Sequence, residues 1–191
     1  CGMSTISATD LDRRIELLET KLIGEHLDKV IGEIQDLAKK FDITKDKKEK
    51  SPFRNVLTVA TEPGSSLEVI KNYIRYQVGR QGSSKIWKDN NGAFAKALVN
   101  ALDGLKTDAS KIIESIETTL SQIYAINESS QENKSDQNSK ESDAKESDAR
   151  HLISSYLKGS MKEKLQKKLH LKLAQLYLGY LAREHTALLQ N

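Results

Sequence analysis

The sequence predicts an all-α protein, a helical bundle of about six helices with an internal disordered polar linker. Hydrophobic residues make up 37% of the chain and aromatic residues only 5%, which suits helices that pack on aliphatic stripes. Apolar residues recur at steps of three and four along most of the chain. The only prolines, Pro52 and Pro63, are close together, so the strongest helix breaker is absent after residue 63.

The first predicted helix spans residues 11–41, where leucine, isoleucine and valine form one apolar stripe of an amphipathic helix. Residues 51–64 hold both prolines, and they are expected to form a loop with at most a short extended piece. A second helix is expected to begin at Ser65, because Glu68 three residues later completes a capping box. This helix should stop near Gly79.

The middle of the chain is expected to hold two further helices. Residues 79–85 are rich in glycine and serine, which indicates a loop. After Asn90-Asn91-Gly92, a third helix should end near Gly104, and a fourth should begin near residue 107. Each has its own apolar stripe.

Residues 127–149 are polar and repetitive, with no aromatic residue and no aliphatic side chain larger than alanine. Such a segment cannot bury enough surface to offset its ordering entropy, so it is predicted to be a disordered linker. A short helix over residues 151–158 and a last helix from Ser160 to Leu189 should follow. The predicted organisation is a bundle core at 1–126, the linker at 127–149, and C-terminal helices at 150–191 that complete the bundle.

Charge is distributed unevenly along the chain. The net charge of +3 combines +4 over residues 51–106, −4 over residues 127–149 and +6 over residues 150–191 with smaller acidic excesses elsewhere. Two basic blocks separated by an acidic block indicate an anionic partner, and nucleic acid is favoured over a membrane.

The cysteine count and hydropathy indicate a cytoplasmic protein without a membrane partner. The single cysteine, Cys1, excludes a disulfide framework and a cysteine-type zinc site. No apolar run approaches the roughly 20 residues of a membrane span, and the first residues lack the apolar stretch of a signal peptide.

The first candidate nucleic-acid site is the basic segment of the second predicted helix and the loop that follows it. Lys71 and Arg75 are four residues apart and should share a helix face. The glycine- and serine-rich loop after them offers N–H groups and hydroxyls for phosphate oxygens, and Trp87 could stack on an unpaired base. Alternatively, Trp87 is a core anchor and the cations form a solvated face. The candidate residues are Lys71, Arg75, Arg80, Lys85, Trp87 and Lys88.

The second candidate site is a lysine stripe on the last helix. Lys164, Lys168 and Lys172 recur every four residues, and like charges at this spacing weaken a helix. Contact with a phosphate backbone would explain the stripe, and an ordinary solvent-exposed face is the alternative.

No catalytic residue, metal site or cofactor is predicted. The loop at 79–85 lacks the glycine-lysine-serine/threonine ending of a Walker A motif. The histidines are scattered, with no HExxH motif, and His185 is expected on an exposed face. A small hydrolase or nuclease would need a metal-ligand set that is not evident in the sequence.

Two segments resemble the small subunits of CRISPR effector complexes. They are Tyr73-Ile74-Arg75-Tyr76-Gln77-Val78-Gly79-Arg80, followed by Trp87 and Phe94-Ala95-Lys96-Ala97-Leu98, and the lysine-rich close of the chain with Leu176-Tyr177-Leu178-Gly179-Tyr180-Leu181. The pattern looks most like the type I-D Cascade small subunit, which is similar to the C-terminal domain of the large subunit.

The resemblance implies a non-catalytic helical subunit of a CRISPR RNA-guided surveillance complex in antiviral defence. Its partners would be the CRISPR large subunit and backbone subunits, the guide RNA and target DNA, and further copies of itself. Its basic faces would support the guide–target duplex and the displaced DNA strand. The alternative left open is a helical adaptor that binds only protein.

Overall fold

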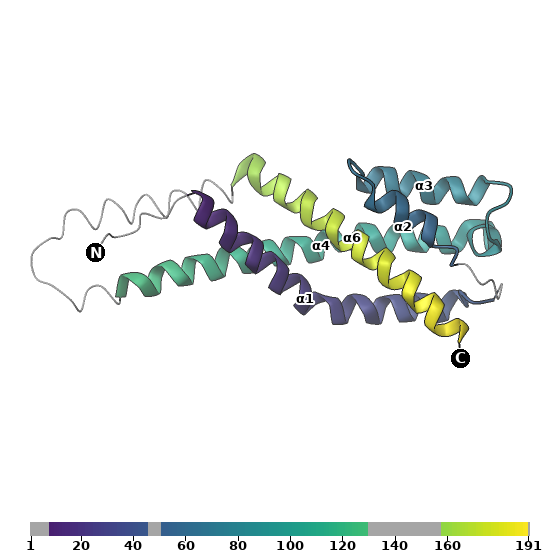
Figure 1. Cartoon of the computed structure of the whole chain (residues 1–191), viewed down its shortest axis with the longest axis horizontal. Coiled ribbons are helices and arrows are strands. Elements are labelled where there is room, and N and C mark those ends of the chain that lie inside the picture. Colours follow the sequence, from purple (N-terminus) through teal and green to yellow (C-terminus); the bar gives the residue numbers. More distant parts are fainter. Residues whose placement is uncertain (1–7, 46–50, 130–157, 191) are drawn as a thin grey trace, which may run out of the picture. The chain divides into compact units, whose positions relative to one another are not determined.

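The computed structural model describes residues 8–45, 51–129 and 158–190, and all regular secondary structure in these ranges is helical. The all-α prediction is therefore confirmed. The described helices are α1 (Ala8–Phe41), α2 (Arg54–Thr61), α3 (Leu67–Gly79), α4 (Lys85–Ser129) and α6 (Gly159–Leu189) (Figure 1).

The contacts within the chain divide it into two compact units. Among the described residues, unit 1 combines residues 8–24 with residues 110–129 and 158–167, and unit 2 combines residues 25–45 and 51–109 with residues 168–190. Helices α1, α4 and α6 each contribute residues to both units, whereas α2 and α3 belong to unit 2 alone.

Unit 1 has an aliphatic core supplied by three helices. Side chains at three- and four-residue spacing bury the facing stripes, as the sequence predicts for α1 and α4. Two polar contacts join α6 to α4: Lys162 Nζ lies 2.9 Å from Glu117 Oε1, and Gln166 Nε2 donates to Ser110 Oγ at 2.6 Å. The buried core residues are Leu11, Ile15, Leu22, Ile23, Ile112, Ile113, Ile116, Leu120 and Leu165.

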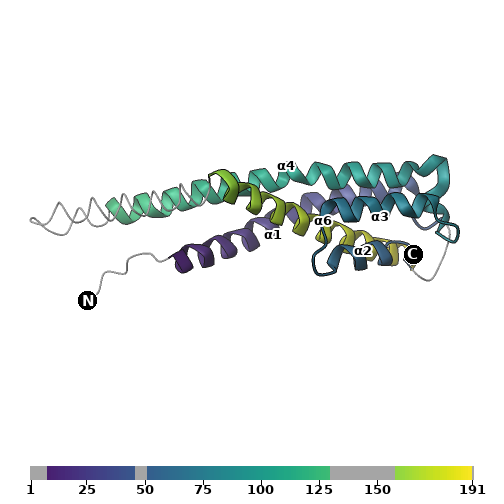
Figure 2. The ribbon, with the colours of Figure 1, turned by 90° about the horizontal axis from the view of Figure 1, so that it is seen from above.

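Unit 2 packs the two short helices against parts of the long ones. Helix α2 contacts α3, and α3 runs beside the first part of α4 in both views of the ribbon (Figures 1 and 2). Helix α6 is attached by hydrogen bonds: His170 Nε2–H donates to the carbonyl of Leu102 at 2.7 Å, and Gln175 Nε2 donates to the carbonyl of Ala60 at 2.8 Å. Ala60 lies in the last turn of α2, where carbonyls lack helical partners, so Gln175 satisfies an otherwise open acceptor.

The structure corrects three predicted boundaries. Residues 54–61 form α2 rather than a loop with an extended piece, because Val56 and Ala60 are buried on one face. Ser66, not Ser65, caps α3, since its side chain accepts from Val69 N–H at 3.3 Å. Helix α4 continues through Gly104 to Ser129, so the third and fourth predicted helices are one.

The last helix agrees with its prediction within one residue at its start, because α6 begins at Gly159 and ends at Leu189. The predicted linker begins at residue 127, but α4 extends to Ser129. The rest of that linker and most of the predicted helix over 151–158 lie outside the described residues.

Candidate nucleic-acid interface

Four predicted cations surround the connection between α3 and α4 in unit 2. Arg75 lies on α3, Arg80 forms its C-terminal cap, and Lys85 and Lys88 lie at the start of α4. All four are solvent-exposed. These four exposed residues therefore lie on one segment of unit 2, from α3 to the start of α4.

Trp87 is a core residue and is withdrawn as a base-stacking candidate. Its side chain is 1% exposed, and its ring meets Phe53 and Phe94 edge-on at centroid distances of 5.7 and 5.4 Å. Edge-to-face packing of this kind stabilises aromatic cores. Because Trp87 stands between Lys85 and Lys88, its burial fixes the backbone that carries these two cations.

A turn with left-handed backbone conformation follows Trp87. Asn90, Asn91 and Gly92 have φ values of 50°, 56° and 73°, so the backbone kinks before α4 resumes its regular course. Asparagine and glycine tolerate this conformation best among the natural residues. A Cβ added at Gly92 would lie 3.0 and 3.1 Å from the two γ-methyl groups of Val78 on α3, so glycine also permits close packing between the helices.

The turn between α3 and α4 uses its own polar groups. Ser83 Oγ lies 2.6 Å from the carbonyl of Gln77 and 3.0 Å from that of Arg80, and Ser83 N–H donates to the same Arg80 carbonyl at 3.4 Å. The single hydroxyl proton is thus donated within the turn. The prediction that this loop's hydroxyls bind phosphate is wrong for Ser83, since that hydroxyl has no proton left to donate.

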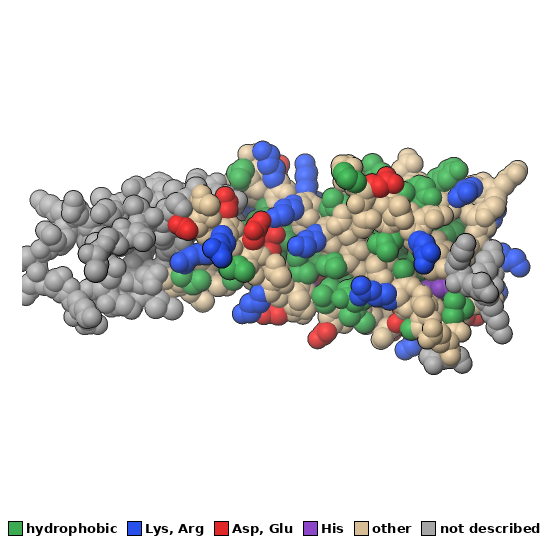
Figure 3. Space-filling model, in the orientation of Figure 1, with side chains coloured by type: hydrophobic (Ala, Val, Ile, Leu, Met, Phe, Trp, Pro, Cys, Tyr) green, Lys and Arg blue, Asp and Glu red, His purple; other side chains and the backbone are tan. Residues whose placement is uncertain are grey.

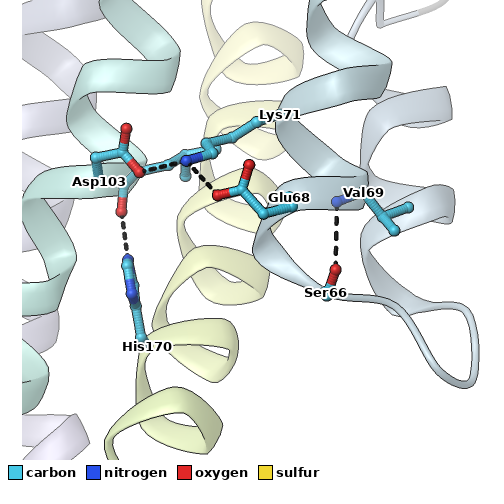
Figure 4. A network of polar contacts seen from close by, with 7 residues as sticks. Ser66, Glu68, Val69, Lys71, Asp103 and His170 are labelled. Atoms are coloured by element: carbon cyan, nitrogen blue, oxygen red, sulfur yellow. Dashed lines mark hydrogen bonds and ion pairs between the residues drawn. The ribbon is translucent and has the colours of Figure 1, made fainter.

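Lys71 forms structural ion pairs with Glu68 and Asp103. Its side chain is 11% exposed, and Nζ lies 2.6 Å from Glu68 Oε1 and 3.0 Å from Asp103 Oδ1 (Figure 4). The hydrogen bonds to Glu68 and then Asp103 raise the pKa of Lys71 above its usual value. Because both carboxylates neutralise the ammonium group, Lys71 is removed from the candidate interface.

The sequence around the four remaining cations is poor in acidic residues. Between Val69 and Leu102 the only acidic residue is Asp89, and its Oδ2 lies 3.6 Å from Lys45 Nζ. The segment between Val69 and Leu102 therefore carries more basic than acidic side chains. Such an excess attracts phosphate chiefly through release of its counterions.

The lysines predicted on the last helix are also exposed, but they belong to different units. Lys164 lies in unit 1, whereas Lys168 and Lys172 lie in unit 2. On the face drawn in Figure 3, lysine and arginine side chains are spread among acidic and hydrophobic ones. These three lysines remain candidates for phosphate contact, each within its own unit.

The sequence analysis missed Tyr76, an exposed aromatic residue that lies between Arg75 and Arg80 in the sequence and could contact a ligand. Its side chain is 54% exposed on α3, between Arg75 and Arg80, and its ring lies 5.8 Å from that of Tyr73. The signal was present in the sequence: the buried stripe of α3 follows Ile70, Ile74 and Gln77, and Tyr76 lies off that stripe.

His185 and the polar groove of unit 2 have structural roles. His185 is buried, contrary to its predicted exposed position, and meets Phe53 edge-on at 5.6 Å. In the groove between α1, α4 and α6, Lys29 Nζ contacts Asp108 at 2.8 Å and Glu33 at 3.4 Å. Among the described residues, no group of three or more histidine, cysteine, aspartate or glutamate side chains could hold a metal ion.

Comparisons with protein-family models, curated proteins and solved structures give no match for this chain. In the ranges that the structure describes, none of the helices has the length and apolar character needed to cross a bilayer.

Proposed function

We propose that this chain is a non-catalytic nucleic-acid-supporting subunit of a CRISPR RNA-guided complex in the cytoplasm. The proposal combines the resemblance in sequence with one structural observation. Arg75, Arg80, Lys85 and Lys88 are exposed around a connection that the buried ring of Trp87 anchors. These side chains would contact the sugar-phosphate backbone of the guide RNA, the target DNA or the displaced strand.

Such a role needs charge and shape rather than a base-reading motif. In RNA-guided complexes, base pairing with the guide provides sequence specificity, and the protein recognises the backbone. A few cations on an ordered segment are adequate for that purpose. Several copies beside the large and backbone subunits would act together, because each bound copy raises the effective concentration of the next contact.

Purification of the tagged chain from its native host tests the assignment. We expect guide RNA to be recovered together with large and backbone subunits of the effector complex. Recovery of protein partners without RNA would contradict the proposal and favour the protein-binding adaptor.

Charge reversal tests the interface within the assembled complex. Arg75→Glu, Arg80→Glu and Lys85→Glu together should weaken target DNA binding by about tenfold or more, because each removes a phosphate contact and adds repulsion. The control carries the same change of charge at exposed residues elsewhere, Arg13, Lys39 and Lys111.

The control triple variant should retain affinity within about twofold, because its positions lie outside the segment from Arg75 to Lys88 and make the same change in net charge. Both triple variants should show the Trp87 fluorescence of the folded chain. Equal affinities for the two folded variants would remove the interface assignment.

A further inference from the structure

The exposed face of α3 combines aromatic and cationic side chains. Its buried side is formed by Ile70, Ile74 and Gln77, so residues offset by about half a turn point to solvent. Tyr76 is 54% exposed there, and Arg80 follows it by four residues. Residues at this spacing are neighbours on a helix surface.

Tyr73 holds the ring of Tyr76 from one side. The two ring centroids lie 5.8 Å apart with an interplanar angle of 45°, and Tyr73 is half-buried. Offset and tilted aromatic pairs are favourable at this distance. Because one tyrosine is partly packed into the unit, the exposed ring has a fixed neighbour and loses less conformational freedom when a ligand binds.

The charges around this face favour a polyanionic ligand over an uncharged, apolar partner. Arg75 and Arg80 flank Tyr76 and are exposed, and the nearest preceding carboxylate on α3, Glu68, is engaged by Lys71 at 2.6 Å. Figure 4 shows that Glu68 and Lys71 meet on the side of α3 that faces Asp103. The exposed side of the helix is consequently free of carboxylates after Glu68.

The apolar part of the face is narrow. Val69, at 47% exposed, and Tyr76 are the only large hydrophobic side chains of α3 that are exposed, and the positions between them include Asn72 and Arg75. A protein helix that docks through its apolar face normally needs anchors on successive turns, with polar groups at the edge. One aromatic ring between two cations better fits the stacking of a base whose phosphates contact arginine.

We infer that this face of α3 binds single-stranded nucleic acid, with an unpaired base stacked on Tyr76 and adjacent phosphates on Arg75 and Arg80. The inference rests on the proposed function and narrows it to an unpaired strand. A base inside a duplex presents no free π-face, so Tyr76 distinguishes single strands from duplexes, whereas the cations contact both.

Fluorescence anisotropy with the full chain tests this inference, using a labelled oligothymidylate and a labelled duplex of equal length. Tyr76→Ala should weaken binding to oligothymidylate by about 5- to 150-fold, the loss expected for one stacked base. Duplex affinity should change by less than about twofold, because the cations remain. Tyr76→Phe, which keeps the ring, should bind both ligands like the unmodified chain.

Val69→Ala is the matched control, since it truncates an exposed apolar side chain of the same helix without removing a ring. We expect it to leave both affinities unchanged. If Val69→Ala and Tyr76→Ala weaken binding equally, or if Tyr76→Ala weakens duplex binding as much as single-strand binding, base stacking is refuted while nucleic-acid binding stands. If the unmodified chain and its assembled complex bind neither oligonucleotide, the proposed function itself fails.

A protein partner on this face gives a different result. Tyr76→Ala would then lower the molar mass of the complex that light scattering measures, because the partner is lost, and would leave oligonucleotide affinity unchanged. This outcome would overturn the inference. Because Tyr76 is largely exposed, its truncation should preserve the fold, and unchanged Trp87 fluorescence and helical circular dichroism verify this.

Discussion

Replacing Gly92 with alanine is expected to destabilise unit 2 by about 1–5 kcal/mol. The residue has a φ of 73°, and a left-handed conformation costs an alanine about 1–2 kcal/mol. The new Cβ would lie 3.0 and 3.1 Å from the γ-methyl groups of Val78, and such overpacking costs about 1–3 kcal/mol. The lower entropy of the unfolded alanine chain offsets about 0.4–1 kcal/mol.

Urea denaturation followed by Trp87 fluorescence measures this loss, because Trp87 is the only tryptophan and is buried in unit 2. Gly104→Ala is the matched control: Gly104 lies within α4, and its added Cβ meets nothing within 4 Å. It should stabilise the protein by up to about 1 kcal/mol, the difference in helix propensity.

A double-mutant cycle separates the steric part of the Gly92 effect from the backbone part. Val78→Ala removes both γ-methyl groups, so Gly92→Ala should cost about 1–3 kcal/mol less in that background. Similar unfolding midpoints for Gly92→Ala and Gly104→Ala would refute the description of this turn.

Three further predictions concern unit 2. Burial lowers the pKa of His185 below its usual 6.5, so the unfolded chain binds more protons below that pH. The free energy of unfolding should therefore decrease as pH falls from 6.5 towards the lowered pKa of the folded state. Urea melts at several pH values measure this dependence, and His185→Leu should remove the part that His185 contributes. Gln175→Leu leaves the Ala60 carbonyl without its side-chain donor and should cost about 1 kcal/mol in the same assay, whereas an unchanged midpoint would argue against that bond. Lys71→Gln should cost about 1 kcal/mol through loss of its pair with Asp103, yet leave oligonucleotide affinity within about twofold; a larger loss of affinity would return Lys71 to the interface.

The long helices could be predicted from sequence because their apolar spacing is regular. The error over residues 54–61 arose because prolines flank a β-branched run, and local propensity there favours loop or strand. Burial of Val56 and the hydrogen bond from Gln175, distant in sequence, stabilise a helix instead. The false break at Gly104 arose because a helix tolerates one glycine when the apolar stripe continues on both sides.

The candidate interface could be predicted only in part. Exposure of Arg75 and Arg80 follows from their positions beside the buried stripe of α3. The fate of Trp87 depends on Phe53 and Phe94, which lie on either side of it in the sequence, and no local pattern shows that their rings meet. Lys71 was predicted to contact nucleic acid for the same reason, since no local pattern shows that its partner, Asp103, lies beside it on another helix.

The salt dependence of oligonucleotide binding tests the nucleic-acid role most directly. Anisotropy titrations of the purified chain with labelled oligothymidylate should give affinities that decrease steeply with salt. If Arg75, Arg80, Lys85 and Lys88 each contact a phosphate, the slope of log affinity against log salt should be about −3. Reversing all four charges should weaken binding at low salt by more than about tenfold. Affinity that does not depend on salt, or affinity that charge reversal leaves unchanged in a folded variant, would contradict the central claim.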